Sequence, residues 1–261
     1  MNDSSAMMSD LPSRFWHVLA LPDRAMLGVK ITRKTLTDNA ALTQADKALL
    51  QTSLKSIEWR YTLKPDTVNI PTLIDDKREY LEIAVLAVTL KDRSKVKALC
   101  HLLHQHIPYP LLLAVSDVGD LALSLAEKQI NQSDSSKLTL HCHYDTGWLS
   151  AIPDERLNPF FANMTFDALS KVSLFDFYRD LIVRVTKLEA SSWTGNYRTA
   201  PHQKDDDATL VQRLSELKAL EVALNALRNQ SSKAVQMNQK IKLNLQAQEL
   251  KRKITALKAT L

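Results

Sequence analysis

The chain has 261 residues, of which 45% are hydrophobic and 24% are charged, as in globular proteins that bury a core of their own. Its only cysteines, Cys100 and Cys142, exclude a disulfide scaffold, and the lack of a signal peptide or a long apolar run predicts a cytoplasmic protein with no membrane span. The net charge of +5 lies near the C-terminus, because residues 233–261 hold seven Lys and Arg against Glu249 alone.

The first part of the chain predicts a helix and a strand after a disordered N-terminus over residues 1–12. Residues 38–57 have a helical repeat of apolar side chains. Thr43 and Asp46 have the spacing of a capping box at the start of that helix. Residues 59–63 then alternate between apolar and polar in the manner of a strand.

The next part predicts a sheet with helices around it. Residues 80–91 are apolar on both faces, which indicates a strand in the interior of a sheet. A helix begins at Asp92 and ends at the sequence Ile-Pro-Tyr-Pro, residues 107–110. Together these segments predict an α+β domain over residues 13–190, with a mixed β-sheet of about five or six strands flanked by helices. The remaining strands are expected at residues 111–115, 121–126 and 137–144, and a closing helix at 165–189.

The C-terminal part has a different pattern. Residues 191–207 are polar, contain three consecutive aspartates and are expected to form a linker. Over residues 208–261 leucines repeat at heptad spacing, with a polar break between Arg228 and Gln239. The two halves are similar in length, so we expect an antiparallel helical hairpin with coiled-coil packing. A single long helix that forms a homodimer is the alternative.

The positive charge of this hairpin forms a candidate binding surface. A concentrated basic face usually reflects solvation or an acidic partner protein, and less often nucleic acid. We therefore expect partner binding, or DNA binding, through the following residues: Lys233, Lys240, Lys242, Lys251, Arg252, Lys253 and Lys258.

No common catalytic or cofactor-binding motif occurs in the sequence. The four glycines are isolated, so they cannot form a phosphate-binding loop. Histidines gather near both cysteines, and zinc would need three or four such ligands to converge. We expect His101 and His104 to lie on the polar side of their helix, away from Cys100, and therefore predict solvated histidines, no metal and no cofactor. The other members of these two groups are His106, His141, Cys142 and His143.

One arrangement suggests an alternative function as a Mg²⁺-dependent nuclease. Nucleases of the PD-(D/E)xK class use two carboxylates to hold Mg²⁺ and a lysine to steady the attacked phosphate. Here Asp66 precedes a strand that ends in Lys91, but Thr89 occupies the place of the second acid, so Glu82 would have to substitute. The simpler interpretation is that Asp66 caps a turn, Glu82 pairs with a cation and Lys91 ends a strand.

Three segments stand out together: a W-x-Y-x-L-x-P-D-T-x-N-x-P run, an I-P-Y-P turn and a basic N-x-K-x-x-L-N segment over residues 238–244. Their combination resembles an uncharacterised bacterial family known only as a domain of unknown function. The resemblance covers most of the chain, from about Leu27 onward. The residues that carry the first two motifs are Trp59, Tyr61, Pro65, Asp66, Thr67, Asn69, Pro71, Pro108, Tyr109 and Pro110.

The resemblance implies a class of function. Genes of that family sit beside helicase and DNA-methyltransferase genes in restriction-like and phage-defence islands. It therefore implies a non-catalytic accessory subunit of a DNA-directed defence system, which docks a helicase or a methyltransferase. Members often carry an acidic residue near the position of Thr89, and this departure weakens the nuclease alternative. A stand-alone DNA-binding regulator is the other alternative.

Overall fold

A computed structural model describes residues 10–39, 41–131, 134–150, 152, 154–199, 204–234 and 236–260. The chain divides into two compact units, Met1–Val185 and Thr186–Leu261. The boundary falls within one helix, α7 (Leu174–Thr194). None of the described helices is long and apolar enough to cross a membrane.

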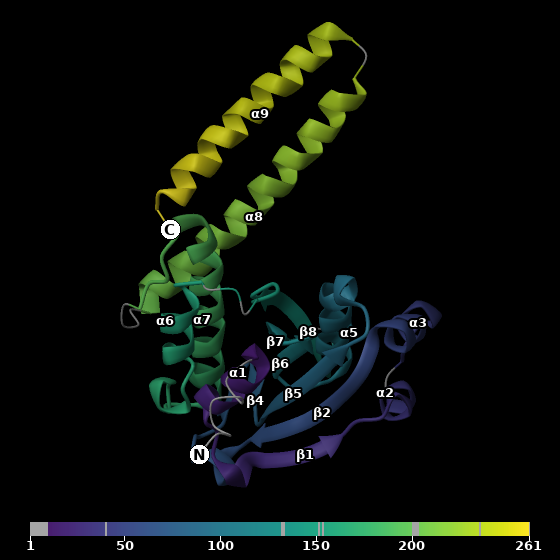
Figure 1. Ribbon diagram of the computed structural model, residues 1–261, viewed down its shortest axis with the longest axis vertical. Helices are drawn as coiled ribbons and strands as arrows, with labels where there is room; N and C mark the ends of the chain where they lie inside the picture. Colours follow the sequence, from purple (N-terminus) through teal and green to yellow (C-terminus); the bar gives the residue numbers. More distant parts are fainter. Residues whose placement is uncertain are drawn as a thin grey trace. The chain divides into compact units, whose positions relative to one another are not determined.

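The first unit is built on a six-stranded mixed sheet (Figure 1). Its strand order is β1-β2-β5-β6-β7-β8. β5 and β6 are parallel, and every other neighbouring pair is antiparallel. The expected α+β class is thus confirmed. The strands are β1 (Met26–Lys30), β2 (Leu54–Leu63), β5 (Ile83–Leu90), β6 (Leu111–Asp117), β7 (Asp120–Asn131) and β8 (Asp134–Asp145).

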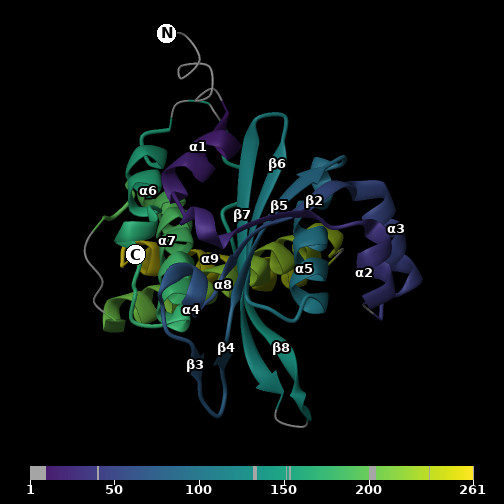
Figure 2. The ribbon, with the colours of Figure 1, turned by 90° about the horizontal axis from the view of Figure 1, so that it is seen from below.

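Helices cover both faces of this sheet (Figure 2). On one face α3 (Gln44–Ser53) and α5 (Val96–His106) enclose a core with β2, β5 and β6. The other face is covered by α1, α6 and the first part of α7. The smaller elements are α1 (Leu11–Leu19), η2 (Asp23–Ala25), α2 (Arg33–Asn39), α4 (Pro65–Val68), β3 (Leu73–Ile74), β4 (Glu79–Tyr80), η3 (Arg93–Lys95), α6 (Leu157–Asn163) and η4 (Phe166–Ala168).

β5 lies in the interior of the sheet, as its apolar composition predicted. It pairs with β2 on one side and β6 on the other. Ile83, Ala84, Val85 and Leu86 are all fully buried, because helices cover both faces. α5 joins β5 to β6, as the parallel pairing of these two strands requires.

The helix expected over residues 38–57 is wrong at its C-terminal end. The capping box of Thr43 and Asp46 is present and begins α3. However, α3 ends at Ser53, and residues from Leu54 onward form β2. A register shift between Leu54 and Ser56 allows Leu54 and Ile57 to be buried on the same face of the sheet. This bulge produces an apolar spacing of three, which imitates a helical repeat.

One tyrosine bridges β6 and β7 where their pairing stops. The last recorded pair at this end is Leu113 with Ser124, and the same register would place Leu111 opposite Ala126. The buried Tyr178 hydroxyl, from α7, occupies this gap instead. It accepts a hydrogen bond from the Ala126 N–H at 2.9 Å and donates to the Leu111 carbonyl at 2.7 Å. The Ala126 N–H and the Leu111 carbonyl do not bond to each other, and the Tyr178 hydroxyl supplies the partner for both. This joins α7 to the sheet.

The second unit contains a helical hairpin, α8 (Lys204–Lys233) and α9 (Met237–Lys258). Ser231 bonds to Asn244, and Arg213 bonds to the Thr260 carbonyl, so the two helices are antiparallel. The hairpin is therefore confirmed over the single long helix. Its core also includes Trp193 of α7, together with Leu214, Leu217, Leu224, Ala247, Leu250, Ile254 and Leu257.

Two expected segments fall partly outside the described residues. Residues 1–9, in the N-terminal segment expected to be disordered, lie outside them, and α1 begins at Leu11. Of the expected linker, residues 191–194 belong to α7 and residues 204–207 to α8. Residues 200–203 between these helices are also outside the described part of the chain.

Replacing Tyr178 with Phe tests the bridge between α7 and the sheet. The change leaves the Ala126 N–H and the Leu111 carbonyl buried without their partner, so we expect the free energy of unfolding to fall by about 1–3 kcal/mol. Urea denaturation measures this difference. Tyr61→Phe is the matched control, because the Tyr61 hydroxyl has no hydrogen bond among the described residues. Equal stability of the two variants would contradict the bridge.

Candidate functional site

The three residues of the nuclease alternative do not form one site. Leu63, at the end of β2, pairs with Ile83, so Asp66 and Glu82 lie toward the same end of β5. Lys91 follows the opposite end, and eight strand residues span about 26 Å. Lys91 instead donates to the Gln51 carbonyl at 3.3 Å. This separation leaves the lysine out of reach of any metal that Asp66 and Glu82 might share.

The P-D-T-x-N part of the first motif forms a compact turn. Pro65 occupies the first turn of α4, where its missing N–H costs nothing. The Thr67 hydroxyl accepts from the Lys64 N–H at 3.0 Å and donates to the Thr62 carbonyl at 2.8 Å. Asn69 ends α4 with a φ of 56°, a left-handed conformation that asparagine tolerates. Local backbone geometry therefore accounts for these motif residues.

Asp66 takes no part in the hydrogen bonds of this turn. Its carboxylate is 70% exposed and lies 3.4 Å from the Lys64 ammonium. An ion pair with this exposure contributes little to stability.

The I-P-Y-P turn is held by a buried lysine that the sequence analysis did not single out. Lys128 of β7 is only 5% exposed, and its Nζ donates to the carbonyls of Ile107 and Tyr109. Burial lowers the pKa of Lys128 to about 7. A neutral amine has two N–H groups, which match the two carbonyls. The turn also meets the first motif, because the rings of Tyr109 and Trp59 pack edge to face at 5.5 Å.

The prediction that the histidines are solvated is wrong for His104. Its side chain is 1% exposed, and its Nε2 lies 2.9 Å from the Ser124 hydroxyl. The same hydroxyl lies 2.7 Å from Nε2 of His143, so α5, β7 and β8 meet at one serine. His104 and Cys100 are four residues apart and therefore share a helix face. This spacing was the available signal that His104 is buried with Cys100.

Two titratable groups of this cluster, His104 and Cys100, are held in their neutral forms. Burial, together with His143, Lys128 and His101, lowers the pKa of His104 well below its ordinary value. Burial raises the pKa of Cys100 to about 12, so its thiol is a poor nucleophile. No group of three or more His, Cys, Asp or Glu among the described residues is arranged to hold a metal ion. The cluster has the properties of a buried polar network within the core.

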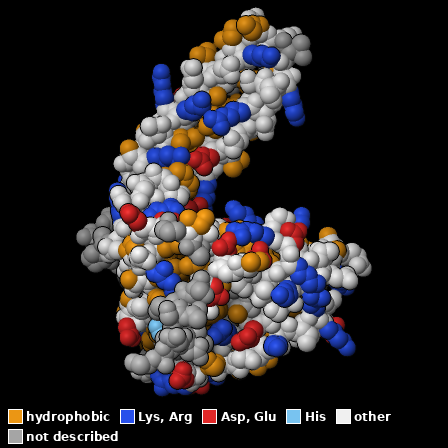
Figure 3. Space-filling view, viewed as in Figure 1, with side chains coloured by type: hydrophobic (Ala, Val, Ile, Leu, Met, Phe, Trp, Pro, Cys, Tyr) orange, Lys and Arg blue, Asp and Glu red, His pale blue; other side chains and the backbone are white. Residues whose placement is uncertain are grey.

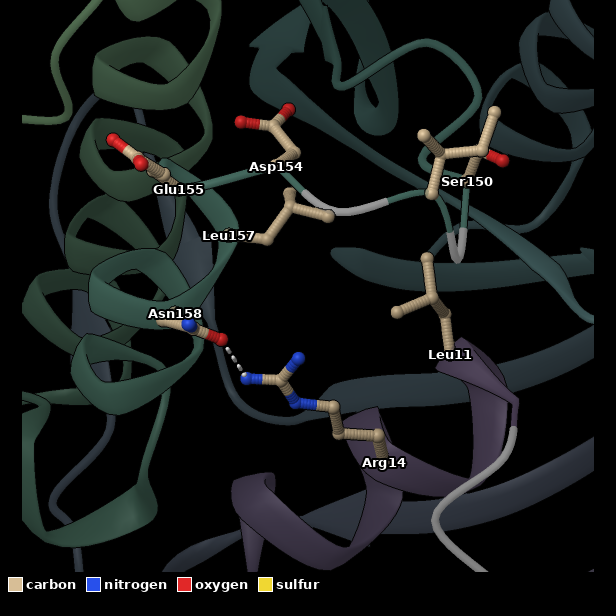
Figure 4. Close-up of a pocket in the computed structure, with 8 residues that line it drawn as sticks. Leu11, Arg14, Ser150, Asp154, Glu155, Leu157 and Asn158 are labelled. Carbon is tan, nitrogen blue, oxygen red and sulfur yellow. Dashed lines mark hydrogen bonds between the residues drawn. The ribbon is translucent and has the colours of Figure 1, made fainter.

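A small cavity of about 180 Å³ lies beside α1 and α6 (Figure 4). Two of its charged groups, Arg14 and Asp154, are already engaged. Arg14 donates to the Asn158 side chain at 2.8 Å, and its guanidinium lies 4.6 Å from the centre of the Phe161 ring. Asp154 pairs with Arg156 at 2.6 Å. In Figure 4 the carboxylates of Asp154 and Glu155 point away from Arg14, so the described lining does not converge on one ligand position.

Lys and Arg side chains lie along the hairpin (Figure 3). The seven of them that were predicted to bind a partner differ in whether they form ion pairs. Lys258 pairs with Glu221 of α8 at 3.0 Å, and Lys253 pairs with Glu249 of its own helix at 3.1 Å. The others form no ion pair with any acid among the described side chains, and most are exposed. These five unpaired cations are Lys233, Lys240, Lys242, Lys251 and Arg252.

Comparison with known proteins identifies a family but not an activity. The family model described as Domain of unknown function (DUF4391) matches residues 19–254. No curated protein and no solved structure matches the chain.

The titration of Lys128 makes stability depend on pH in the alkaline range. The unfolded lysine binds a proton up to about pH 10.4, whereas the folded amine releases it near pH 7. Stability therefore rises with pH between these values, by up to about 1.4 kcal/mol per unit. We expect urea denaturation between pH 7.5 and about 9.5 to show this slope in the parent chain and not in Lys128→Met. The exposed Lys47→Met is the control, and equal slopes in both variants would contradict the assignment.

His104 has the corresponding effect in acid. The unfolded histidine takes up a proton below about pH 6.5, and the folded one does not, because its pKa is lowered. The free energy of unfolding should thus keep the whole His104 contribution above that pH. It should decline as the pH falls toward 5, by up to about 1.4 kcal/mol per pH unit. His104→Gln should remove part of this decline, whereas the exposed His17→Gln should not. An unchanged decline in His104→Gln would show that His104 titrates normally.

Proposed function

We propose that this chain, which belongs to the family described as Domain of unknown function (DUF4391), is a non-catalytic accessory subunit. In this proposal the hairpin docks a larger DNA-acting protein, a helicase or a DNA methyltransferase of a restriction-like, anti-phage system. The proposal takes the partner class from the family resemblance and the docking element from the charges of the hairpin.

The observation that carries the proposal is the excess of unpaired positive charge on α9. This helix holds six Lys and Arg against Glu249 alone. Its apolar seam is already packed against α8, so the charges are not needed to attach it. Lys251, Arg252 and Lys253 are consecutive, so at 100° per residue their charges spread around about 200° of the helix. An acidic surface on a partner would be attracted to these charges from a distance.

The arrangement of the first unit supports a role without catalysis. Two of its groups with strongly lowered pKa values, His104 and Lys128, are buried and hydrogen-bonded within the core. The nuclease alternative needs Lys91 beside Asp66, and the two lie toward opposite ends of β5. A stand-alone DNA-binding regulator would use the same basic helix, so experiment must separate it from the docking function.

Reversal of four lysines tests the docking function. The variant carries Lys240→Glu, Lys242→Glu, Lys251→Glu and Lys253→Glu, which leaves the apolar seam of the hairpin intact. We expect its co-purification with a helicase or methyltransferase partner from the native host to fall at least about tenfold, because each charge contributes up to about 1 kcal/mol. The matched control reverses four exposed lysines of the first unit to Glu: Lys34, Lys47, Lys55 and Lys77.

The remaining outcomes distinguish the alternatives. If the purified chain binds DNA and neutralises about four phosphates, log affinity should fall with log salt at a slope near −3 to −4. Loss of that binding in the reversed variant would favour the DNA-binding regulator. A reversed variant that keeps both its partner and any DNA binding would show that the basic face only provides solvation.

A further inference from the structure

α9 presents a second apolar face that its packing against α8 does not use. Met237, Ile241 and Leu245 are spaced four residues apart, so they form one stripe along the helix. Their side chains are 72%, 51% and 61% exposed, respectively. Surface helices normally place polar residues on the solvent side. This stripe therefore needs an explanation other than the hairpin itself.

The stripe is separate from the hairpin core. Leu245 and Ile254 are nine residues apart, which is about 180° around an α-helix. Ile254 is 7% exposed and belongs to the core with α8, so Leu245 points away from α8. Removing large aliphatic side chains from water is favourable, so a ligand that covers this stripe gains binding free energy in proportion to the apolar area that it buries.

Positive charges border the stripe on both sides. Lys240 and Lys242 flank Ile241, and at 100° per residue they project on opposite sides of it. Arg252 lies close to the same line, beyond Gln248. All three cations lack an ion pair with the described acids. An apolar strip with a cationic rim matches a ligand that is apolar along its centre and acidic along its edges.

We propose that the stripe of Met237, Ile241 and Leu245 seats an acidic amphipathic helix of a partner protein, packed alongside α9. This inference rests on the docking function proposed above and specifies the chemistry of the docked element. The partner helix supplies apolar side chains at positions i, i+4 and i+7 or i+8, with Glu or Asp on either side facing Lys240 and Lys242. The result is a three-helix arrangement with α9 in the middle.

Other occupants fit the stripe less well. A second copy of α9 would bring its own excess of positive charge against the same lysines. The described side chains of α8 also offer no acidic face, with Arg213, Lys218, Arg228 and Lys233 against two glutamates. DNA would pair with the lysines but leave the aliphatic side chains uncovered. Membrane-surface helices use larger apolar faces, often with Trp or Phe, which α9 lacks.

A photo-crosslinking amino acid placed at Gln248 of the full chain, in native cells, identifies the occupant. Gln248 is exposed and lies on the line of the stripe without belonging to it. We expect adducts with one partner segment that has a net negative charge and a helical apolar repeat, as identified by mass spectrometry. A crosslinker at Val222 of α8, which is 70% exposed, is the positional control and should not capture that segment.

Two substitution variants show whether the stripe itself is responsible. Ile241→Ser with Leu245→Ser should reduce the adduct at least about tenfold, since it removes the apolar surface that the partner would bury on two large side chains. Val222→Ser is the matched control and should leave the adduct unchanged. Adducts with a second copy, nucleic acid or lipid, adducts with a segment that is not acidic, or none above the Val222 level would overturn the inference.

The stripe variant and the charge-reversed variant separate this inference from the docking function. The stripe variant keeps every positive charge, and the charge-reversed variant keeps every apolar residue. If charge reversal abolishes partner binding while the stripe variant retains it, the docking function stands and the acidic helix is wrong. If neither variant loses the partner, the hairpin is not the docking element and both proposals fail.

Discussion

The first unit depends on how the chain satisfies the backbone groups around its I-P-Y-P turn. Two prolines within four residues remove two N–H donors, so neither α5 nor a sheet ladder can continue through the turn. The carbonyls of the turn are instead bonded to other elements. Lys128 of β7 donates hydrogen bonds to the carbonyls of Ile107 and Tyr109. The Ala84 N–H of β5 donates to the carbonyl of Pro110. Just beyond the turn, Tyr178 bridges β6 and β7.

These bonds explain why polar side chains lie in the core at all. A carbonyl buried without a donor costs about 1–3 kcal/mol, so the turn is tolerated only with a donor beside it. Lysine reaches both carbonyls from the neighbouring strand, and burial lowers its pKa to about 7. The hydrogen bonds of Lys128 and Tyr178 thus hold elements of the first unit together. On the hairpin, five of the predicted binding cations form no ion pair among the described residues, and the side chains of Met237, Ile241 and Leu245 are exposed.

The candidate sites were predictable to different degrees. The basic face of α9 could be predicted because charge and heptad spacing are properties of one continuous helix. The exposed stripe follows from the same helix once its core positions are known, but the exposure of Met237, Ile241 and Leu245 was not predicted from the sequence. The nuclease residues are the opposite case. Their order along the chain was compatible with a shared site, but the pairing of β2 with β5 places Lys91 at the far end of the strand.

The spacing of residues that are close together in the sequence was sufficient to predict three features. These are the capping box of Thr43 and Asp46, the buried strand β5 and the two hairpin helices. Each depends on spacing within one element, and the sequence by itself therefore determined them. Only the tertiary structure decided the sheet order, the bulge at Leu54, and the meeting of His104, Ser124 and His143. These features join segments 19 or more residues apart, and the free energy of a shared hydrogen bond depends on a distance that no local pattern contains.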